Sequence, residues 1–92
     1  MLGFYQLELF IPSALSLKEK RFVLKSIKDR IRNKFNVSIA ELGENEKWQR
    51  SLLGIAMVSN DSQLIENSFN KILNLIDNDG RVEVIDRLIE FY

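Results

Sequence analysis

The sequence predicts an α+β domain in which strands and helices follow one another in the order β-α-β-β-α-β. Three observations lead to this prediction: four segments with strand-like patterns, two segments with apolar residues at helical spacing, and a capping motif before each helical segment. The chain has 92 residues, of which 46% are hydrophobic and 28% charged, a composition typical of a folded globular protein. This length suits one domain, so we expect residues 1–92 to fold as a single unit.

Residues 2–11 are expected to form the first strand, because their side chains fall into two distinct faces with a period of two. Pro12 lacks an amide hydrogen and should end this strand. One face would carry Tyr5, Leu7, Leu9 and Ile11. The opposite face would carry Phe4, Gln6, Glu8 and Phe10.

Residues 16–19 read Ser-Leu-Lys-Glu, which is a capping box at the start of a helix. We expect the Ser16 hydroxyl to accept a hydrogen bond from the amide of Glu19, and the Glu19 carboxylate to accept one from the amide of Ser16. The helix should end near Lys34, whose charge suits the negative end of the helix dipole. Its apolar side would consist of Leu17, Leu24, Ile27, Ile31 and Phe35.

The second half of the chain repeats this pattern of strand, helix and strand. Residues 36–42 alternate as a second strand, and residues 43–47 have the composition of a hairpin loop. Residues 48–59 form a third strand, which we expect to be central because it is more apolar than the others. Residues 81–92 should form the last strand, at an edge of the sheet, because charges lie on both of its faces.

A second helix is expected between the last two strands. Asn60 would be its N-cap, with Gln63 in the return position of the capping box. Gly80 should terminate this region, because glycine readily adopts the left-handed conformation that follows a helix. The apolar side of this helix would consist of Leu64, Ile65, Phe69, Ile72, Leu73, Leu75 and Ile76.

This order of elements is the ferredoxin-like plan, a four-stranded antiparallel sheet with both helices on one face. The other face of the sheet would then be open, and Phe4 and Phe10 would form an apolar patch on it. Leu52, Ala56 and Val58 of the third strand would join this patch. Either the patch mediates self-association, or side chains of the edge strands and terminal residues cover it.

Basic residues are concentrated in the first helical segment, although the chain has 13 basic and 13 acidic residues in total. Residues 18–34 carry a net charge of +6, and the rest of the chain carries −6. This segregation predicts one positive and one negative side of the molecule. Phe22 falls far from the apolar side of the helix, where it would either stack on a base or pack under a loop.

Five basic residues of this segment are spaced three and four apart and would form a stripe beside the apolar side, with no acidic residue in it. We call these residues the basic stripe. A stripe of this kind is suited to binding phosphates. An ordinary solvated helix face, or pairing with the acidic surface of a second copy, would also explain it. The basic stripe consists of Lys18, Arg21, Lys25, Lys28 and Arg32, with Arg50 as an additional candidate for the same contact.

The composition excludes the commonest enzyme chemistries. The chain contains no His and no Cys, so it has no imidazole or thiol group, and we expect no enzyme activity, no cofactor and no metal. Around the hairpin, Glu41, Glu44 and Glu46 favour a solvated turn over a divalent-cation site. Trp48 and Arg50 form either a recognition cluster or the end of the core, with Arg50 stacked on the indole. The sequence has neither a membrane span nor a signal peptide, so a cytoplasmic location is expected.

Four segments together resemble a known protein family. They are residues 16–21 (SLKEKR), 36–41 (NVSIAE), 48–50 (WQR) and 58–61 (VSND). In this order and spacing they are similar to the YlxP-like family of small bacterial proteins. The resemblance implies a ferredoxin-like fold and a cytoplasmic protein of unestablished function, often encoded among translation and ribosome-maturation genes.

From these observations we expect a non-enzymatic binding module. The leading hypothesis is RNA or a ribosomal particle bound through the basic stripe. The alternative is a self-associating scaffold or regulatory module that uses the open face of the sheet, with Phe4, Phe10 and Trp48 in the interaction surface. An enzyme that uses Arg50 and the hairpin acids is the least favoured hypothesis.

Overall fold

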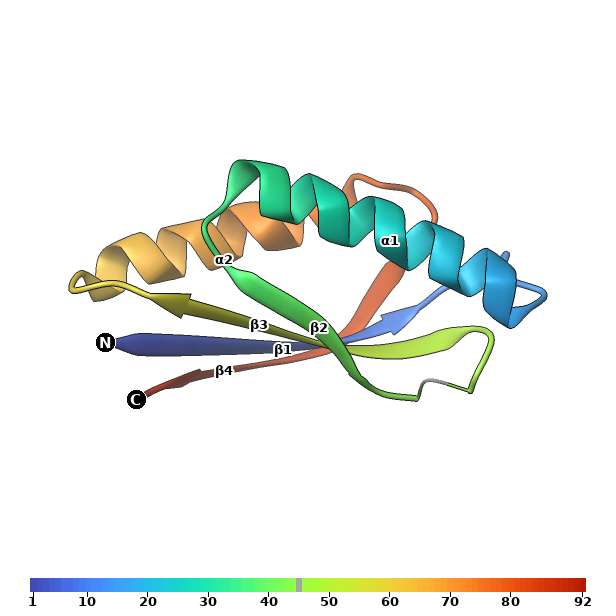
Figure 1. Cartoon of the computed structure of the whole chain (residues 1–92), viewed down its shortest axis with the longest axis horizontal. Coiled ribbons are helices and arrows are strands. Elements are labelled where there is room, and N and C mark those ends of the chain that lie inside the picture. Colours follow the sequence, from blue (N-terminus) through green and yellow to red (C-terminus); the bar gives the residue numbers. More distant parts are fainter. Residues whose placement is uncertain (45) are drawn as a thin grey trace.

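The structure is a computed structural model that describes residues 1–44 and 46–92. Its element order confirms the predicted β-α-β-β-α-β arrangement (Figure 1). The elements are β1 (Leu2–Phe10), α1 (Leu17–Lys34), β2 (Ser38–Gly43), β3 (Arg50–Val58), α2 (Ser62–Asp77) and β4 (Glu83–Phe91).

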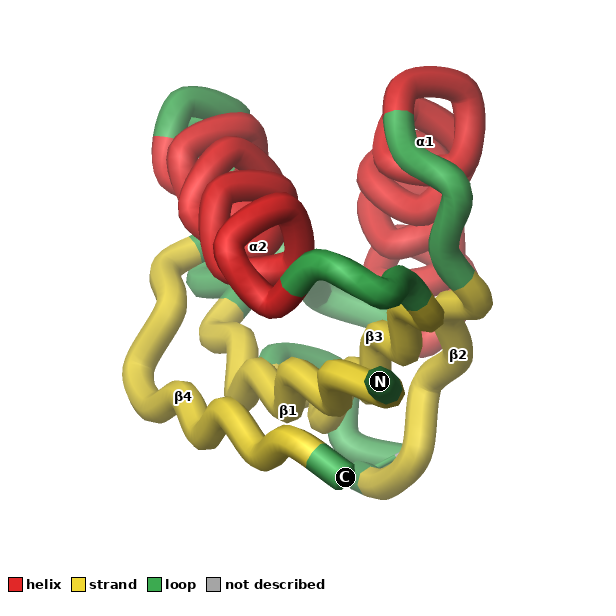
Figure 2. Tube along the Cα trace, turned by 90° about the vertical axis from the view of Figure 1, so that its left-hand side faces the viewer, coloured by secondary structure: helices red, strands yellow, loops and turns green. Residues whose placement is uncertain are grey.

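The four strands form one antiparallel sheet in the order β2-β3-β1-β4. β3 is central and β4 is an edge strand, as predicted. Both helices lie on the same face of the sheet, and the opposite face has no helix over it (Figure 2). The α+β, ferredoxin-like architecture is therefore confirmed.

The core lies between the sheet and the two helices. The predicted inner face of β1 is completely buried, and the ring of Tyr5 stacks on Phe69 of α2 with centroids 4.9 Å apart. From α1, three of the five expected apolar residues are buried, whereas Leu17 and Phe35 at the helix ends are only partly buried. The buried residues of α1 are Lys20, Val23, Leu24, Ile27 and Ile31.

The helix starts differ from the predicted capping boxes in their detail. Ser16 Oγ accepts from the amide of Glu19 at 3.1 Å, but the Glu19 carboxylate accepts from the amide of Leu15 at 2.6 Å rather than from that of Ser16. The N-cap of α2 is Asp61, not Asn60, and its carboxylate accepts from the amide of Gln63 at 2.9 Å. A charged carboxylate also interacts favourably with the positive end of the helix dipole.

No helix in the described residues is long and apolar enough to cross a membrane.

The strands are slightly shorter than predicted, and both edge strands are irregular. β2 begins at Ser38 and β3 begins at Arg50, each two residues later than expected. The register of β2 on β3 shifts between Glu41 and Gly43, and the register of β1 on β4 shifts between Glu8 and Leu9. The predicted hairpin loop connects β2 to β3, and its residue 45 lies outside the described part of the chain. As predicted, Gly80 after α2 has a positive φ, of 83°.

Gly3 tests how closely α2 packs on β1. A Cβ atom at Gly3 would collide with the side chain of Ile65 and lie 3.1 Å from the ring of Phe69. We expect Gly3→Ala to lower the free energy of unfolding by about 1–3 kcal/mol, measured by urea denaturation. Gly43→Ala is the matched control, because its Cβ would meet only Leu52, at 3.4 Å, and should change stability by less than about 0.5 kcal/mol. Equal denaturation midpoints for the two variants would contradict this packing.

Candidate functional site

The basic stripe lies on the solvent side of α1. The buried residues of α1 turn toward the sheet, so the helical repeat places the stripe residues along the outer flank. Four of the five are exposed and Lys28 is half-buried. From Lys18 to Arg32 the stripe extends about 21 Å along the helix axis.

Asp29 interrupts the basic stripe, so the prediction that it contains no acidic residue is wrong. One carboxylate oxygen of Asp29 lies 2.8 Å from Lys25 Nζ, and the other lies 3.8 Å from Arg32 Nη1. The hydrogen bond from Lys25 lowers the pKa of Asp29. Arg32 also donates to the carbonyl oxygen of Ile39 in β2, at 2.9 Å. Two of the five cations are therefore engaged within the protein.

The other three cations of the stripe have no such partners. Lys18, Arg21 and Lys28 make no ion pair and no side-chain hydrogen bond with the residues that the structure describes. Arg21 and Lys28 line a hollow of about 360 Å³ between α1 and β2, together with Lys25 and Arg32. Leu24 and the acidic residues Asp29 and Glu41 complete the lining, so four cations and two carboxylates border this hollow.

Lys20 differs from its basic neighbours because it is completely buried, which the sequence analysis did not foresee. Its Nζ lies 3.1 Å from Glu41 Oε2 and donates to the carbonyl oxygens of Glu44 at 2.8 Å and Arg50 at 3.0 Å. Glu41 also accepts from Ser51 Oγ at 2.7 Å. Lys20 thus links α1 to both strands of the β2–β3 hairpin. Lys20 lies one helical turn before Leu24, on the same side of α1. This spacing is the sequence feature that could have indicated its burial.

Two of the three acidic residues around the hairpin are engaged with basic side chains. Glu41 is held by Lys20, and Glu44 pairs with Lys47 at 3.2 Å. In the described part of the chain, no three acidic side chains come together in a way that could hold a metal ion.

Arg50 does not join the basic stripe. It pairs with Phe10 across the β1–β3 ladder and therefore lies on the sheet face away from α1. Its guanidinium lies 5.4 Å from the centroid of the Phe10 ring and 3.6 Å from Glu8 Oε1. The expected alternative in which Arg50 stacks on Trp48 at the end of the core is wrong, because strand register sets the partner of Arg50 and Trp48 is 55% exposed. Phe10, Trp48 and Arg50 instead line one surface hollow of about 430 Å³.

The open face of the sheet carries the predicted apolar residues. The ladder pairs Phe4 with Ala56 and Leu2 with Val58, which places these side chains on one face. Leu42 of the edge strand approaches Gly54 in the middle of this face, so an edge side chain covers part of it. Among the described residues, the exposed apolar side chains of this face include Leu2, Leu42, Val58 and Leu88.

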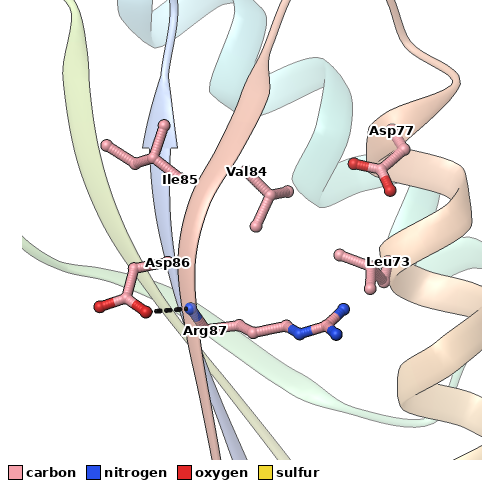
Figure 3. A pocket seen from close by; sticks show the side chains of 6 residues that line it. All are labelled: Leu73, Asp77, Val84, Ile85, Asp86 and Arg87. Atoms are coloured by element: carbon pink, nitrogen blue, oxygen red, sulfur yellow. Dashed lines mark hydrogen bonds between the residues drawn. The ribbon is translucent and has the colours of Figure 1, made fainter.

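A separate hollow of about 310 Å³ lies between α2 and β4. Figure 3 shows Arg87 extending from β4 toward Leu73 and Asp77, whereas Asp86 points away and accepts from the backbone amide of Arg87. Burial raises the pKa of Tyr5, and the nearby Arg87 guanidinium opposes this rise. The sequence analysis did not predict this hollow. The sequence feature that could have indicated this hollow is Arg87, because the other side chains on that face of the strand turn toward a helix.

The chain matches a family of known proteins. A family model described as "Protein of unknown function (DUF503)" matches residues 2–89. The chain belongs to the DUF503 family. It is 47% identical over 83 residues to the "Uncharacterized protein YlxP" of Bacillus subtilis (strain 168), with 90% of each chain covered. The predicted resemblance to the YlxP-like family is therefore confirmed, and neither the DUF503 description nor the name of this relative assigns an activity.

Among solved structures, this DUF503 chain is similar to a C-terminal segment of the alpha subunit of aIF2 from Pyrococcus abyssi. The sequence identity is 15% and the TM-score is 0.47, with all of this chain and 50% of the other chain covered. The chain thus spans half the length of that structure. A likeness of this size contributes nothing to the functional argument.

Lys20→Met tests the buried link between α1 and the hairpin. The methionine fills a similar volume but leaves Glu41 and two carbonyl oxygens without their donor. We expect the free energy of unfolding to fall by about 2–4 kcal/mol in urea denaturation. Lys18→Met is the control, because Lys18 is exposed and its replacement should change stability by less than about 0.5 kcal/mol. A Lys20→Met protein as stable as the parent would show that burying the ammonium costs as much as its contacts contribute.

Proposed function

We propose that this DUF503 protein is a non-enzymatic module that binds RNA through the basic stripe. The observation that carries the proposal is that three exposed or half-buried cations make no ion pair and no side-chain hydrogen bond with the described residues: Lys18, Arg21 and Lys28. Of these three, Lys28 interacts with Asp29 through its charge. Lys25 and Arg32 add two cations that Asp29 holds in place.

Mutual repulsion within the stripe supports an anionic partner. Like charges three and four residues apart destabilise a helix by a few tenths of a kcal/mol per pair. Asp29 relieves only part of this repulsion, because it pairs with Lys25 and Arg32 and interacts with Lys28 through charge alone. The cations recur about every 4.5–6 Å along the axis, so a phosphate chain lying along α1 would meet several of them in succession.

The source of the RNA is a separate part of the proposal. The YlxP-like resemblance points to translation, so a ribosomal particle is the source of RNA that we propose. A cytoplasmic location belongs to the same proposal. The lack of imidazole and thiol groups and the absence of an acidic cluster in the described residues favour binding over catalysis.

The salt dependence of binding tests the stripe. For a labelled 12-nucleotide RNA, we expect the slope of log K against log salt to be about −2 with three phosphate contacts and about −3.5 with five. The double variant Arg21→Gln with Lys28→Gln should weaken binding and reduce the size of this slope by about 1.4. The control is Lys71→Gln with Arg87→Gln, which removes the same charge from α2 and β4 and should leave the slope unchanged.

Two outcomes would reject RNA binding through the stripe. One is a salt-independent affinity or no binding at low salt. The other is an equal loss in both double variants, which would show that net charge rather than the stripe determines binding. Cosedimentation of the protein with ribosomal particles at low salt, reduced by the α1 variant alone, would support the ribosomal setting.

A second candidate function is self-association through the open face of the sheet. The observation that favours it is the group of exposed apolar side chains on that face, which the helices leave uncovered (Figure 2). The face also carries Arg50 together with acidic residues, including Glu8. Basic and acidic groups of one copy could therefore pair with those of a second copy. This surface is opposite the helices and does not compete with the basic stripe for space.

Sedimentation velocity over a range of protein concentrations tests this second candidate. We expect a dimer at high concentration, and Leu88→Lys should shift the chain to monomer by placing a charge in the apolar face. Leu88 is 51% exposed, so the monomer should remain folded. Leu64→Lys on α2, at a residue that is 49% exposed, should leave the dimer unchanged. A parent protein that stays monomeric at all concentrations contradicts self-association.

A further inference from the structure

Phe22 is the most exposed aromatic side chain in the described part of the chain, with 71% of its surface accessible. It lies on α1 one turn after Lys18 and three residues before Lys25, beside the basic stripe. Its ring takes no part in the core. The ring is therefore accessible to a partner, and cations flank it on the surface of α1.

Phe22 borders a hollow of about 570 Å³ between the start of α1 and the loop that leads from α2 to β4. Ala14 and Val23 contribute apolar surface to this hollow, and Lys18 and Arg81 contribute positive charge. Glu19 also lines it, but its carboxylate accepts from the amide of Leu15. The hollow therefore combines an accessible ring with two cations and one carboxylate.

Arg81 is held in place at this hollow by a network of charges. Its guanidinium donates to both carboxylate oxygens of Asp79, at 2.6 and 2.8 Å, and to Ser26 Oγ of α1 at 3.1 Å. Asp79 also pairs with Arg30 of α1 at 3.0 Å. The hydrogen bond from Arg81 lowers the pKa of Asp79, so this carboxylate remains charged at neutral pH. These contacts fix the Arg81 guanidinium at the edge of the hollow, as part of an ion pair with Asp79.

We propose that Phe22 stacks on a nucleobase of the strand whose phosphates contact the basic stripe, so that the ligand is single-stranded RNA. This inference rests on the proposed function. Single-strand binders combine a cationic track for the backbone with aromatic side chains on which bases stack. In an RNA duplex the bases are already paired and stacked inside the helix, so their faces cannot reach an exposed ring.

The surroundings of Phe22 favour a nucleic acid over a protein partner. A protein hot spot usually places its aromatic anchor among other apolar side chains that exclude water. Around Phe22, the outer surface of α1 instead presents Lys18, Arg21 and Lys25, all exposed. A base attached to a phosphate chain matches both the ring and these charges.

Fluorescence anisotropy with three labelled probes tests the proposal. The probes are a 12-nucleotide single-stranded RNA, the same RNA as a duplex, and an abasic phosphodiester of equal length. We expect Phe22→Ala to weaken binding of the single strand about 5- to 100-fold, without changing the slope of log K against log salt. Binding of the duplex and of the abasic chain should not change. Phe22→Tyr should retain the affinity of the parent, whereas Phe22→Leu should resemble Phe22→Ala, because leucine is apolar but cannot stack.

The outcomes separate this inference from the proposed function. Unchanged affinity of Phe22→Ala for single-stranded RNA, with the salt slope and the stripe variants behaving as expected, overturns stacking but leaves RNA binding intact. An equal loss for the abasic chain also overturns stacking. A parent protein that binds none of the probes overturns both proposals. Because Phe22 is exposed, the variants should keep the melting temperature of the parent, and Phe22→Tyr reports on stacking even if Phe22→Ala is unstable.

Discussion

Burial of one face of β1 is the constraint on which the rest of the structure depends. Tyr5, Leu7 and Leu9 are fully enclosed between the sheet and the helices, so both helices must lie on this face. The rotation of α1 about its axis is then fixed, because Ile27 and Ile31 must point down into the same core. The outward side of α1 is what remains, and all five cations of the basic stripe lie there. The exposure of the stripe is thus a consequence of core packing.

Basic residues of α1 have three different environments within a few turns. Lys20 is buried and satisfied by the hairpin, Lys25 and Arg32 share Asp29, and Arg21 is free of ion pairs with the described residues. A count of charges along the segment cannot distinguish these environments. The distinction matters for function, because only cations that are not already paired gain fully from meeting a phosphate.

The sequence was sufficient for the architecture because its signals are local. Alternation along β1 and the cap at Ser16 depend on neighbouring residues, and both are found in the structure. The site was harder to predict because its contacts join distant segments: Lys20 meets a hairpin more than twenty residues away, and Arg50 meets Phe10 through strand register. Asp29 is the exception, because its contact with Lys25 four residues before it is a local signal in the sequence. The shift of the second cap by one residue reflects two adjacent side chains of similar capping ability.

The register shifts in β2 and β4 determine how the sheet can grow. Both rims of the sheet are kinked, and a kinked rim presents its free backbone groups out of line with a straight incoming strand. Edge-to-edge polymerisation by strand addition is therefore disfavoured at both edge strands, even though β4 is long and bears exposed apolar side chains. Self-association through the open face, as proposed above, would instead stop at a closed pair, because each copy has one such face.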